Sequence, residues 1–362
     1  MSATSKKVLI RCDGAPEIGF GHVVRCLALA DELRGSHGCR VDFAMLQGPQ
    51  GVAKVQAQGY AVFQPNHGIE DSDEGKWLKE LIIDCQYQVL ILDVRTDLAT
   101  DAVQSIRESG VLIATIDDPS DRRLHADLAF YPPGPQVERL DWTGFTGDRF
   151  VGWDWVLLRP QFAEAVRKTW RSKSEALRRT LAEDTPMTVL ITMGGSDPAG
   201  LTLMALEGIE QLDANLHILL VIGGGFMHET ALHERLGTTK CHYEICRNVT
   251  DMASLMVEAD LAIASFGVTA YELAAMNVPT IYLCLTEDHA DSANAFVSAG
   301  LGNSLGQYSG VTLDSLTIAI EQALLSVHAN QRFCGSRDEL PDGLGALRIA
   351  SRLCGIFPNT LN

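Results

Sequence analysis

The sequence predicts an α/β protein of two similar domains, each built on a parallel β-sheet. Short apolar runs alternate with longer segments of helical periodicity, which is the pattern of buried parallel strands covered by helices on both faces. This alternation occurs twice, and the second cycle begins at Thr188 after a charged stretch. A chain of 362 residues with 46% hydrophobic residues is long enough for two such domains.

Eight apolar runs are the expected strands. Those of the first cycle are Val8–Ile10, Val41–Leu46, Val89–Leu92 and Leu112–Ile116. Those of the second cycle are Thr188–Met193, His217–Ile222, Leu261–Ala264 and Thr280–Leu283, with a helix expected at Leu201–Ile209. We therefore expect an N-terminal domain at residues 1–158, a linker helix without glycine at residues 159–185, a C-terminal domain at residues 186–345 and a C-terminal tail at residues 346–362.

Charge and cysteine content narrow the class of protein. The formal net charge of −17 argues against a nucleic-acid partner, because phosphate backbones are bound by clustered Lys and Arg. The nine cysteines are scattered without a C-x-x-C pair, which favours reduced thiols in a cytoplasmic protein over a disulfide framework or a zinc site. Only a short apolar run follows Lys6 and Lys7, so neither a signal peptide nor a membrane span is expected.

The most informative stretch is Gly19-Phe20-Gly21-His22-Val23-Val24-Arg25-Cys26, between the first expected strand and a helix. Free N–H groups at a helix start attract anions, and glycines such as Gly14, Gly19 and Gly21 let backbone approach a ligand closely. Histidine titrates near neutral pH, so His22 is a candidate general base. The alternative is a structural turn in which His22 caps the helix or packs.

Polar side chains follow several of the expected strands. Two parallel sheets that face each other form a cleft along the carboxyl ends of their strands, and ligands bind at such edges. Each Asp or Ser taken alone is also consistent with a turn or N-cap role. The residues are Asp13, His22, Asp93, Asp117, Asp118, Ser196 and Asp197.

A second glycine-containing turn, Ser265-Phe266-Gly267-Val268-Thr269, follows an expected strand in the second cycle. Backbone and hydroxyl donors of such a turn can bind a diphosphate. Glu272, about one helical turn further on, can accept hydrogen bonds from the two hydroxyls of a ribose. The alternative is a capping box in which Thr269 is the N-cap and Glu272 its partner.

Taken in order, these motifs resemble a family of nucleotide-sugar enzymes, and the resemblance covers nearly the whole chain. The chain looks like the UDP-sugar hydrolase of the pseudaminic-acid pathway and equally like the spore-coat polysaccharide biosynthesis proteins described as glycosyltransferases. The Glu272 segment is also similar to the UDP-binding region of the lipid-II-forming GlcNAc transferase. The segments that carry the resemblance are Gly21–Cys26, Asp117-Asp118 with Arg122 and His125, Leu157–Phe162, Met193–Pro198 and Asp260–Pro279.

The resemblance implies the GT-B architecture, in which two Rossmann-like domains face each other across a cleft and the segment after Leu344 crosses back onto the first domain. It implies that His22 activates water for attack at the anomeric carbon with release of UDP. Asp13 or Arg25 is then expected to orient His22. The implied partner is a nucleotide sugar, and no metal or other cofactor is implied, because helix N-terminal amides can neutralise the departing diphosphate.

The resemblance also implies which residues hold the nucleotide. Gly267, Val268 and Thr269 match the phosphate-binding turn, Glu272 matches the ribose-binding glutamate, and the Cys246–Met252 loop holds the uracil. The full set of expected nucleotide-sugar contacts is Gly21, Gly195, Ser196, Val249, Ser265, Gly267, Val268, Thr269, Glu272 and His289.

Two segments depart from the hydrolase pattern. Asp93–Asp97 lacks a tyrosine that the hydrolase has, and Thr286–Asn294, which is expected to face the sugar, replaces an Asn-Gln pair. Both departures favour the spore-coat branch. Transfer to an acceptor hydroxyl therefore remains an alternative to hydrolysis, and a non-catalytic nucleotide-sugar-binding protein is a second alternative. Arg95 is expected either to bind an anionic group or to pair with Asp93 or Asp97 at the surface.

Overall fold

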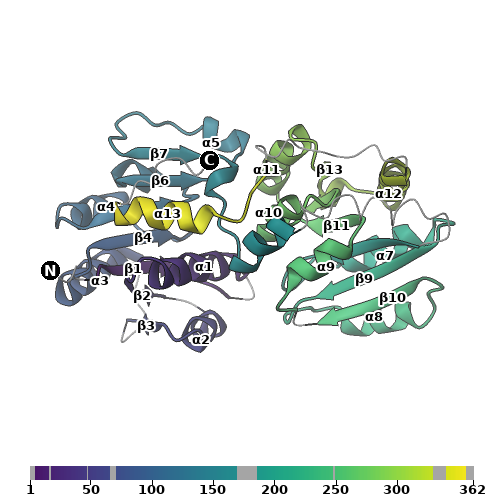
Figure 1. The fold of residues 1–362 in the computed structure, drawn as a ribbon, viewed down its shortest axis with the longest axis horizontal. Coiled ribbons are helices and arrows are strands. Elements are labelled where there is room, and N and C mark those ends of the chain that lie inside the picture. The colour runs from purple at the N-terminus through teal and green to yellow at the C-terminus, as the bar shows by residue number, and fades with distance from the viewer. Residues whose placement is uncertain are drawn as a thin grey trace. The chain divides into compact units, whose positions relative to one another are not determined.

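The computed structural model describes residues 5–15, 18–46, 48–65, 71–168, 186–247, 249–328 and 340–355. The chain divides into two compact units (Figure 1). Unit 1 consists of Met1–Pro133, Val137–Arg159 and Leu344–Asn362, and unit 2 consists of Gly134–Gln136 and Pro160–Gly343. Each unit contains one β-sheet in which all paired strands are parallel, as the alternation of apolar runs and helical segments predicts.

The sheet of unit 1 has seven strands, and the N-terminal strand lies inside it. Its order is β3 (Ala61–Phe63), β2 (Arg40–Ala44), β1 (Lys7–Cys12), β4 (Val89–Asp93), β5 (Leu112–Ile116), β6 (Leu128–Tyr131) and β7 (Asp148–Val151). Because β1 and β4 are neighbours, the residues that follow β1 and those that end β4 lie at the same edge of the sheet.

Helices cover both faces of this sheet, because strand side chains point alternately to opposite faces. Val8 and Ile10 of β1 pack in one core with helices α1 (Gly21–Gly35), α2 (Pro49–Ala57) and α13 (Gly345–Cys354). Leu9 packs in the opposite core with α3 (Asp71–Cys85) and α4 (Thr100–Arg107). The unit also contains the short helical segments η1 (Asp121–His125) and η2 (Trp153–Trp155), and the division between the units runs through α5 (Pro135–Glu138).

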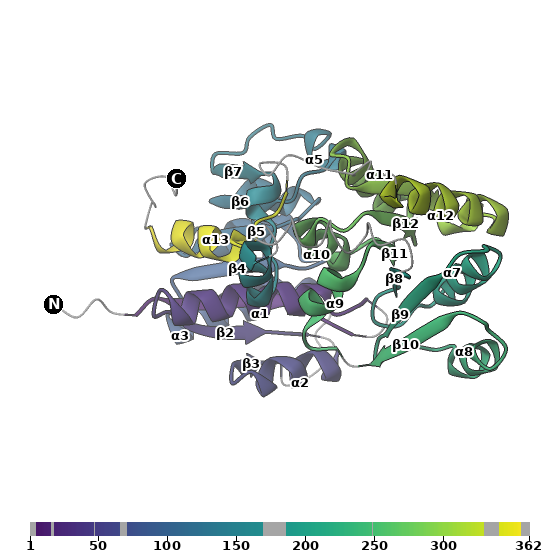
Figure 2. The ribbon, with the colours of Figure 1, turned by 45° about the vertical axis from the view of Figure 1, so that its right-hand side comes forward.

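The C-terminal helix α13 returns to unit 1 after the chain has built unit 2. Ala346, Ile349 and Leu353 of this helix are buried in the core that contains α1, and α13 lies beside α1 in both ribbon views (Figures 1 and 2). Gly345 allows the close approach, since a Cβ at this position would lie 2.1 Å from the Val156 carbonyl oxygen. The crossing back of the segment after Leu344, which the resemblance implied, is thereby confirmed.

The sheet of unit 2 has six strands. Their order is β10 (His242–Arg247), β9 (Leu216–Ile222), β8 (Met187–Thr192), β11 (Leu261–Ser265), β12 (Thr280–Cys284) and β13 (Gly302–Gln307). One face packs against α7 (Leu201–Glu210), α8 (Glu229–Leu236) and α12 (Leu313–His328). Unit 2 also contains α9 (Met252–Glu258), α10 (Val268–Met276), α11 (Glu287–Ser298) and η3 (Tyr308–Gly310).

All eight expected strands are present, but five strands were not expected. These are β3, β6, β7, β10 and β13. Three of them, β7, β10 and β13, carry polar sequences and are mostly exposed or half-buried, because they lie at or near a sheet edge and need no continuous apolar run. The expected linker helix begins as residues 160–168, which are helical, and its remainder lies outside the described residues. None of the described helices combines the length and the apolar character that crossing a bilayer requires.

Candidate active site at the carboxyl edge of the unit 1 sheet

A tightly packed turn leads from β1 into α1. A Cβ at Gly14 would lie 2.6 Å from Val23 Cγ2, and a Cβ at Gly48, whose φ is +81°, would lie 2.0 Å from the Gly14 carbonyl oxygen. Only glycine avoids both clashes, so the turn is held closely against the first turn of α1 and the start of α2. Helix α1 begins at Gly21, and His22 is therefore in its first turn, as the sequence predicts.

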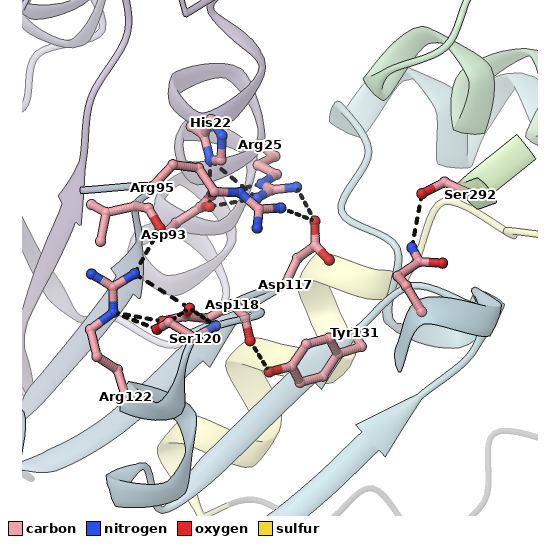
Figure 3. A network of polar contacts seen from close by, with 12 residues as sticks. His22, Arg25, Asp93, Arg95, Asp117, Asp118, Ser120, Arg122, Tyr131 and Ser292 are labelled. Atoms are coloured by element: carbon pink, nitrogen blue, oxygen red, sulfur yellow. Dashed lines mark hydrogen bonds and ion pairs between the residues drawn. The ribbon is translucent and has the colours of Figure 1, made fainter. Parts of the chain in front are cut away.

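Three side chains of α1 converge on one carboxylate, that of Asp93 at the end of β4. Figure 3 shows two of them, His22 and Arg25, beside Asp93. His22 Nδ1 lies 2.6 Å from Asp93 Oδ1, and Arg25 donates from Nε to Oδ2 at 2.7 Å and from Nη2 to Oδ1 at 2.5 Å. The Cys26 thiol donates to Oδ2 at 3.2 Å. Residues three and four positions after His22 share its side of a helix, so the spacing of this motif fits one common partner.

The buried position of Asp93 determines the electrostatics of this cluster. Its side chain has 0% exposure, whereas that of His22 has 21%. Burial alone would raise the pKa of the Asp93 carboxyl, but the charges and hydrogen bonds of Arg25 and His22 outweigh it and hold that pKa well below its usual range. Burial, with Cys12 and Asp93 nearby, raises the pKa of the Cys26 thiol, which therefore remains a donor. Asp93 is thus a fixed negative charge under His22.

The distances indicate which nitrogen of His22 carries its proton. Nδ1 is 3.1 Å from Arg25 Nη2, which is a donor, and 2.6 Å from Asp93 Oδ1, which is an acceptor. The shorter contact to the carboxylate requires an N–H at Nδ1, and Arg25 lies nearby because it binds the same oxygen. This assignment leaves Nε2 of a neutral His22 with a lone pair that can accept a proton.

The carboxylate in contact with His22 is that of Asp93 and not that of Asp13. Asp93 contacts His22, whereas Asp13 accepts a hydrogen bond from the backbone N–H of Leu46 at 2.8 Å and pairs with Arg11 at 2.6 Å. Arg11 is fully buried and also binds Glu74 at 2.7 Å on the α3 side of the sheet. Asp13 is thus bound by Arg11 and by the backbone that follows β2, whereas Asp93 and Arg25 are the partners of His22.

Asp117 extends the cluster outward from α1 (Figure 3). Its Oδ2 lies 3.6 Å from Arg25 Nη1 and 3.2 Å from Arg95 Nη2. Arg95 is 49% exposed, and among the described residues it pairs with Asp117 rather than with Asp93 or Asp97. Asp117 has a φ of +51°, in the left-handed region that few non-glycine residues adopt. A strained residue shared by two guanidinium groups marks this edge as a candidate functional site.

The second half of the Asp117-Asp118 motif has a structural role. Asp118 accepts from Arg122 Nε at 3.1 Å and from Ser120 Oγ at 2.7 Å. Arg122 is nearly fully buried, and its Nη1 donates to the Thr96 carbonyl at 2.6 Å. These bonds join the loop after β5 to the loop after β4, which carries Arg95. Within the described residues, no group of three or more His, Cys, Asp or Glu side chains is placed to hold a metal ion.

In unit 2, the turn after β8 is built as tightly as the turn after β1. Asp197 accepts from the backbone N–H groups of Leu201 and Thr202 at 2.8 and 2.9 Å, which gives it the helix-capping role. A Cβ at Gly223 would lie 2.4 Å from the Gly195 carbonyl oxygen. Gly195 is exposed and Ser196 half-buried at this edge.

The helix start after β11 contradicts the capping-box alternative, because Thr269 is not the N-cap residue. Gly267 occupies the N-cap of α10 without a side-chain hydrogen bond, and Thr269 is the second residue of the helix. The helix start is half-buried at Gly267, Val268 and Thr269. Ser265 and Glu272 are buried, and Glu272 has 3% exposure. An N-terminus that no N-cap side chain occupies can bind an anion.

Two other expected nucleotide contacts lie on separate elements of unit 2. The ring of His289, in the first turn of α11, lies 6.1 Å from the ring of Phe266 in the β11–α10 turn. Val249 lies between β10 and α9, next to Asp251, whose Oδ1 accepts from the Ser254 backbone N–H at 3.2 Å. Residue 248 in this loop lies outside the described residues. The structure thus brings His289 close to Phe266 of the β11–α10 turn, whereas Val249 lies in the loop between β10 and α9.

No family model matches the chain. An uncharacterized protein of Methanocaldococcus jannaschii is 29% identical over 287 residues, which are 78% of this chain and 56% of that protein. The chain thus spans little more than half the length of this archaeal relative. The spore coat polysaccharide biosynthesis protein SpsG of Bacillus subtilis is 22% identical over 351 residues, 96% of this chain and 98% of that one.

Solved structures identify the architecture. MurG of Acinetobacter baumannii aligns with a TM-score of 0.70 at 17% identity, over 96% of this chain and 99% of that chain. The chain has the GT-B fold. A UDP-GlcNAc 2-epimerase of Neisseria meningitidis, solved bound to UDP-GlcNAc, aligns with a TM-score of 0.63 at 11% identity, over 96% of this chain and 100% of that chain. Identities this low establish the fold alone.

Proposed function

We propose that the chain is a nucleotide-sugar-processing enzyme of surface-polysaccharide or nonulosonic-acid biosynthesis. In this proposal it cleaves the anomeric C–O bond of a UDP-amino-sugar with water activated by His22. The observation that carries the proposal is the convergence of His22, Arg25 and Cys26 on the buried carboxylate of Asp93. The spore-coat relative and the epimerase bound to UDP-GlcNAc support the substrate class.

The hydrogen bonds of His22 support a general-base role for it in this proposal. Asp93 accepts a hydrogen bond from the Nδ1–H of His22, so Nε2 is the nitrogen that takes the proton of the attacking water. The water oxygen bonds to the anomeric carbon while the bond from that carbon to the diphosphate oxygen breaks, and the electron pair leaves with UDP. The imidazolium that forms is stabilised by the negative charge of Asp93, which Arg25 keeps ionised.

Unit 2 supplies the nucleotide contacts in this proposal. The N–H groups and hydroxyls at the start of α10 bind the diphosphate, and Glu272 binds the ribose hydroxyls. The loop of Val249 contacts the uracil. Further contacts to the nucleotide sugar come from Gly195, Ser196 and His289. Gly21 has the corresponding role at the start of α1 in unit 1.

Glycosyl transfer is the second candidate, and the MurG-like fold and the spore-coat relative favour it. The same histidine would then deprotonate an acceptor hydroxyl, whose oxygen replaces that of water at the anomeric carbon. The donor contacts would be unchanged.

Incubation with a panel of UDP-, CMP- and GDP-sugars in the absence of an acceptor tests the proposal. Hydrolysis predicts release of free UDP and of the free sugar. Binding without release favours the transferase, and conversion of the sugar while it remains attached to UDP would contradict both candidates. Absence of binding to every nucleotide sugar would contradict the substrate class.

Replacing Glu272 with Gln is expected to weaken UDP binding by roughly 1–3 kcal/mol, because the charge-assisted hydrogen bonds to the ribose are lost. Calorimetry with UDP and with 2′-deoxy-UDP measures this effect, and the variant should no longer distinguish the two ligands. Glu321→Gln, an exposed glutamate of α12, is the matched control and should bind UDP normally. Unchanged affinity in the Glu272 variant would return this residue to a structural role.

Replacing Arg95 with Tyr is expected to raise KM roughly 10- to 150-fold for a substrate that carries a carboxylate or an additional phosphate, with kcat unchanged. The exposed guanidinium of Arg95 is held beside the His22 cluster by Asp117, so it is placed to bind an anionic group. Arg34→Tyr is a closely matched control, since Arg34 is 47% exposed and pairs with Asp31 at 3.1 Å. Equal KM values for both variants and the parent protein would leave Arg95 as a surface residue.

A further inference from the structure

Two cysteines far apart in the sequence meet in unit 1. Cys39 directly precedes β2, and Cys354 is the last residue of α13. Their sulfur atoms are 3.6 Å apart although the residues are separated by 315 positions. A disulfide bond needs a separation of about 2.05 Å, so the two sulfur atoms are in van der Waals contact but not bonded.

Both cysteines are held by well-fixed backbone. The Cys39 N–H donates to the Leu33 carbonyl at 2.9 Å, at the end of α1. On the other side, Lys6 Nζ donates to the Leu353 carbonyl at 3.2 Å, and Leu353 itself is buried in the unit 1 core. The pair is therefore preorganised by the fold rather than brought together by a chance side-chain conformation.

We propose that Cys39 and Cys354 are a redox modification site, at which oxidation forms a disulfide that fixes helix α13 to unit 1. The proposal is independent of the proposed enzyme activity. With a peroxide as oxidant, the Cys354 sulfur attacks an oxygen, the O–O bond breaks, and water leaves to give a sulfenic acid. The Cys39 sulfur then forms the S–S bond and displaces the hydroxyl, which leaves as a second water with the Cys39 proton.

Exposure fixes the order of these two steps. Cys354 is half-buried, whereas Cys39 is buried with 5% exposure. Burial and the neighbouring Cys354 sulfur also raise the pKa of Cys39 to about 12, so its thiol is protonated at neutral pH. Cys354 therefore meets the oxidant first, and Cys39 acts as the resolving thiol.

The consequence of the bond follows from the topology of the chain. Unit 1 is assembled from segments on both sides of unit 2, and the cross-link would close a loop that contains residues 160–343. Closing so long a loop restricts the unfolded chain strongly and keeps α13 on the core of unit 1. We therefore expect the oxidised protein to resist thermal unfolding of unit 1.

The test treats the full chain with hydrogen peroxide and maps its peptides without reduction. We expect a Cys39–Cys354 peptide pair that dithiothreitol separates, and a rise in Tm on the order of 5 °C that reduction reverses. Cys354→Ser and Cys39→Ser should lose both effects, and Cys85→Ser, at a half-buried thiol of α3, should keep them. Recovery of Cys39 and Cys354 on separate peptides, or a cross-link with unchanged Tm, would overturn the proposal.

Discussion

Replacing His22 with Asn is expected to reduce turnover by about 10²–10⁴-fold, the range typical for loss of a general base. Asparagine cannot accept the proton of water, but it is of similar size, and His22 is partly exposed, so the free energy of unfolding should change little. The affinity for UDP should also remain, because the expected nucleotide contacts lie mainly in unit 2. Steady-state kinetics, calorimetry with UDP and thermal melting measure these three quantities.

His233→Asn is the control for this variant, since His233 is an exposed histidine on α8. It should match the parent protein in all three measurements. A His22 variant that unfolds, or that keeps most of its activity, would show that His22 is a packing residue and that the proposed mechanism is wrong.

Replacing Asp93 with Asn is expected to lower both activity and stability. Turnover should fall by about 10²–10⁴-fold, because the amide neither fixes the Nδ1 proton of His22 nor stabilises the imidazolium. The free energy of unfolding should fall by roughly 3–5 kcal/mol, because a mostly buried Arg25 loses its close counter-ion. Urea unfolding measures the second effect.

Asp127→Asn provides the matched control for stability. Asp127 pairs with Arg107 at 2.7 Å, but it is about one-third exposed, so its loss should cost about 1 kcal/mol or less. If Asp93→Asn does not fold, Cys26→Ala, which removes one donor to Asp93, is measured in its place. Equal losses of unfolding free energy in the Asp93 and Asp127 variants would contradict the role of Asp93 as the buried counter-ion of Arg25.

The lowered pKa of Asp93 predicts the pH dependence of its contribution. Its folded-state pKa lies below the ordinary value of 3.8, so the unfolded chain takes up this proton first as the pH falls. The stabilisation is therefore present above about pH 4 and is lost as the pH falls below it. The free energy of unfolding, measured from pH 7 to pH 3, should decrease less for Asp93→Asn than for the parent protein.

Most of the fold was predictable because its central strands are continuous apolar runs. β1, β4, β5, β8 and β11 are buried on both faces, and their sequences carry that signal directly. The polar strands β10 and β13 carry no such signal, since an edge strand is defined by its hydrogen bonds to a neighbour that sequence periodicity does not reveal.

The motif that carries His22 was predictable from the sequence, but the contact between His22 and Asp93 was not. The sequence predicts His22 at a helix start and an aspartate at the end of β4, yet it does not show that these two meet. One signal was available, namely that His22, Arg25 and Cys26 are spaced to share one side of a helix. The left-handed φ of Asp117 and its contact with Arg95 depend on tertiary packing, which no local pattern encodes.

The measurement that tests the central claim most directly is turnover of a UDP-sugar in ¹⁸O-labelled water, with mass spectrometry of the nucleotide product. Attack of water on the anomeric carbon breaks the C–O bond, so the account predicts UDP without ¹⁸O and label in the released sugar, and strongly reduced release with His22→Asn. Label in the phosphate of the released nucleotide, or release at an unchanged rate without His22, would contradict it.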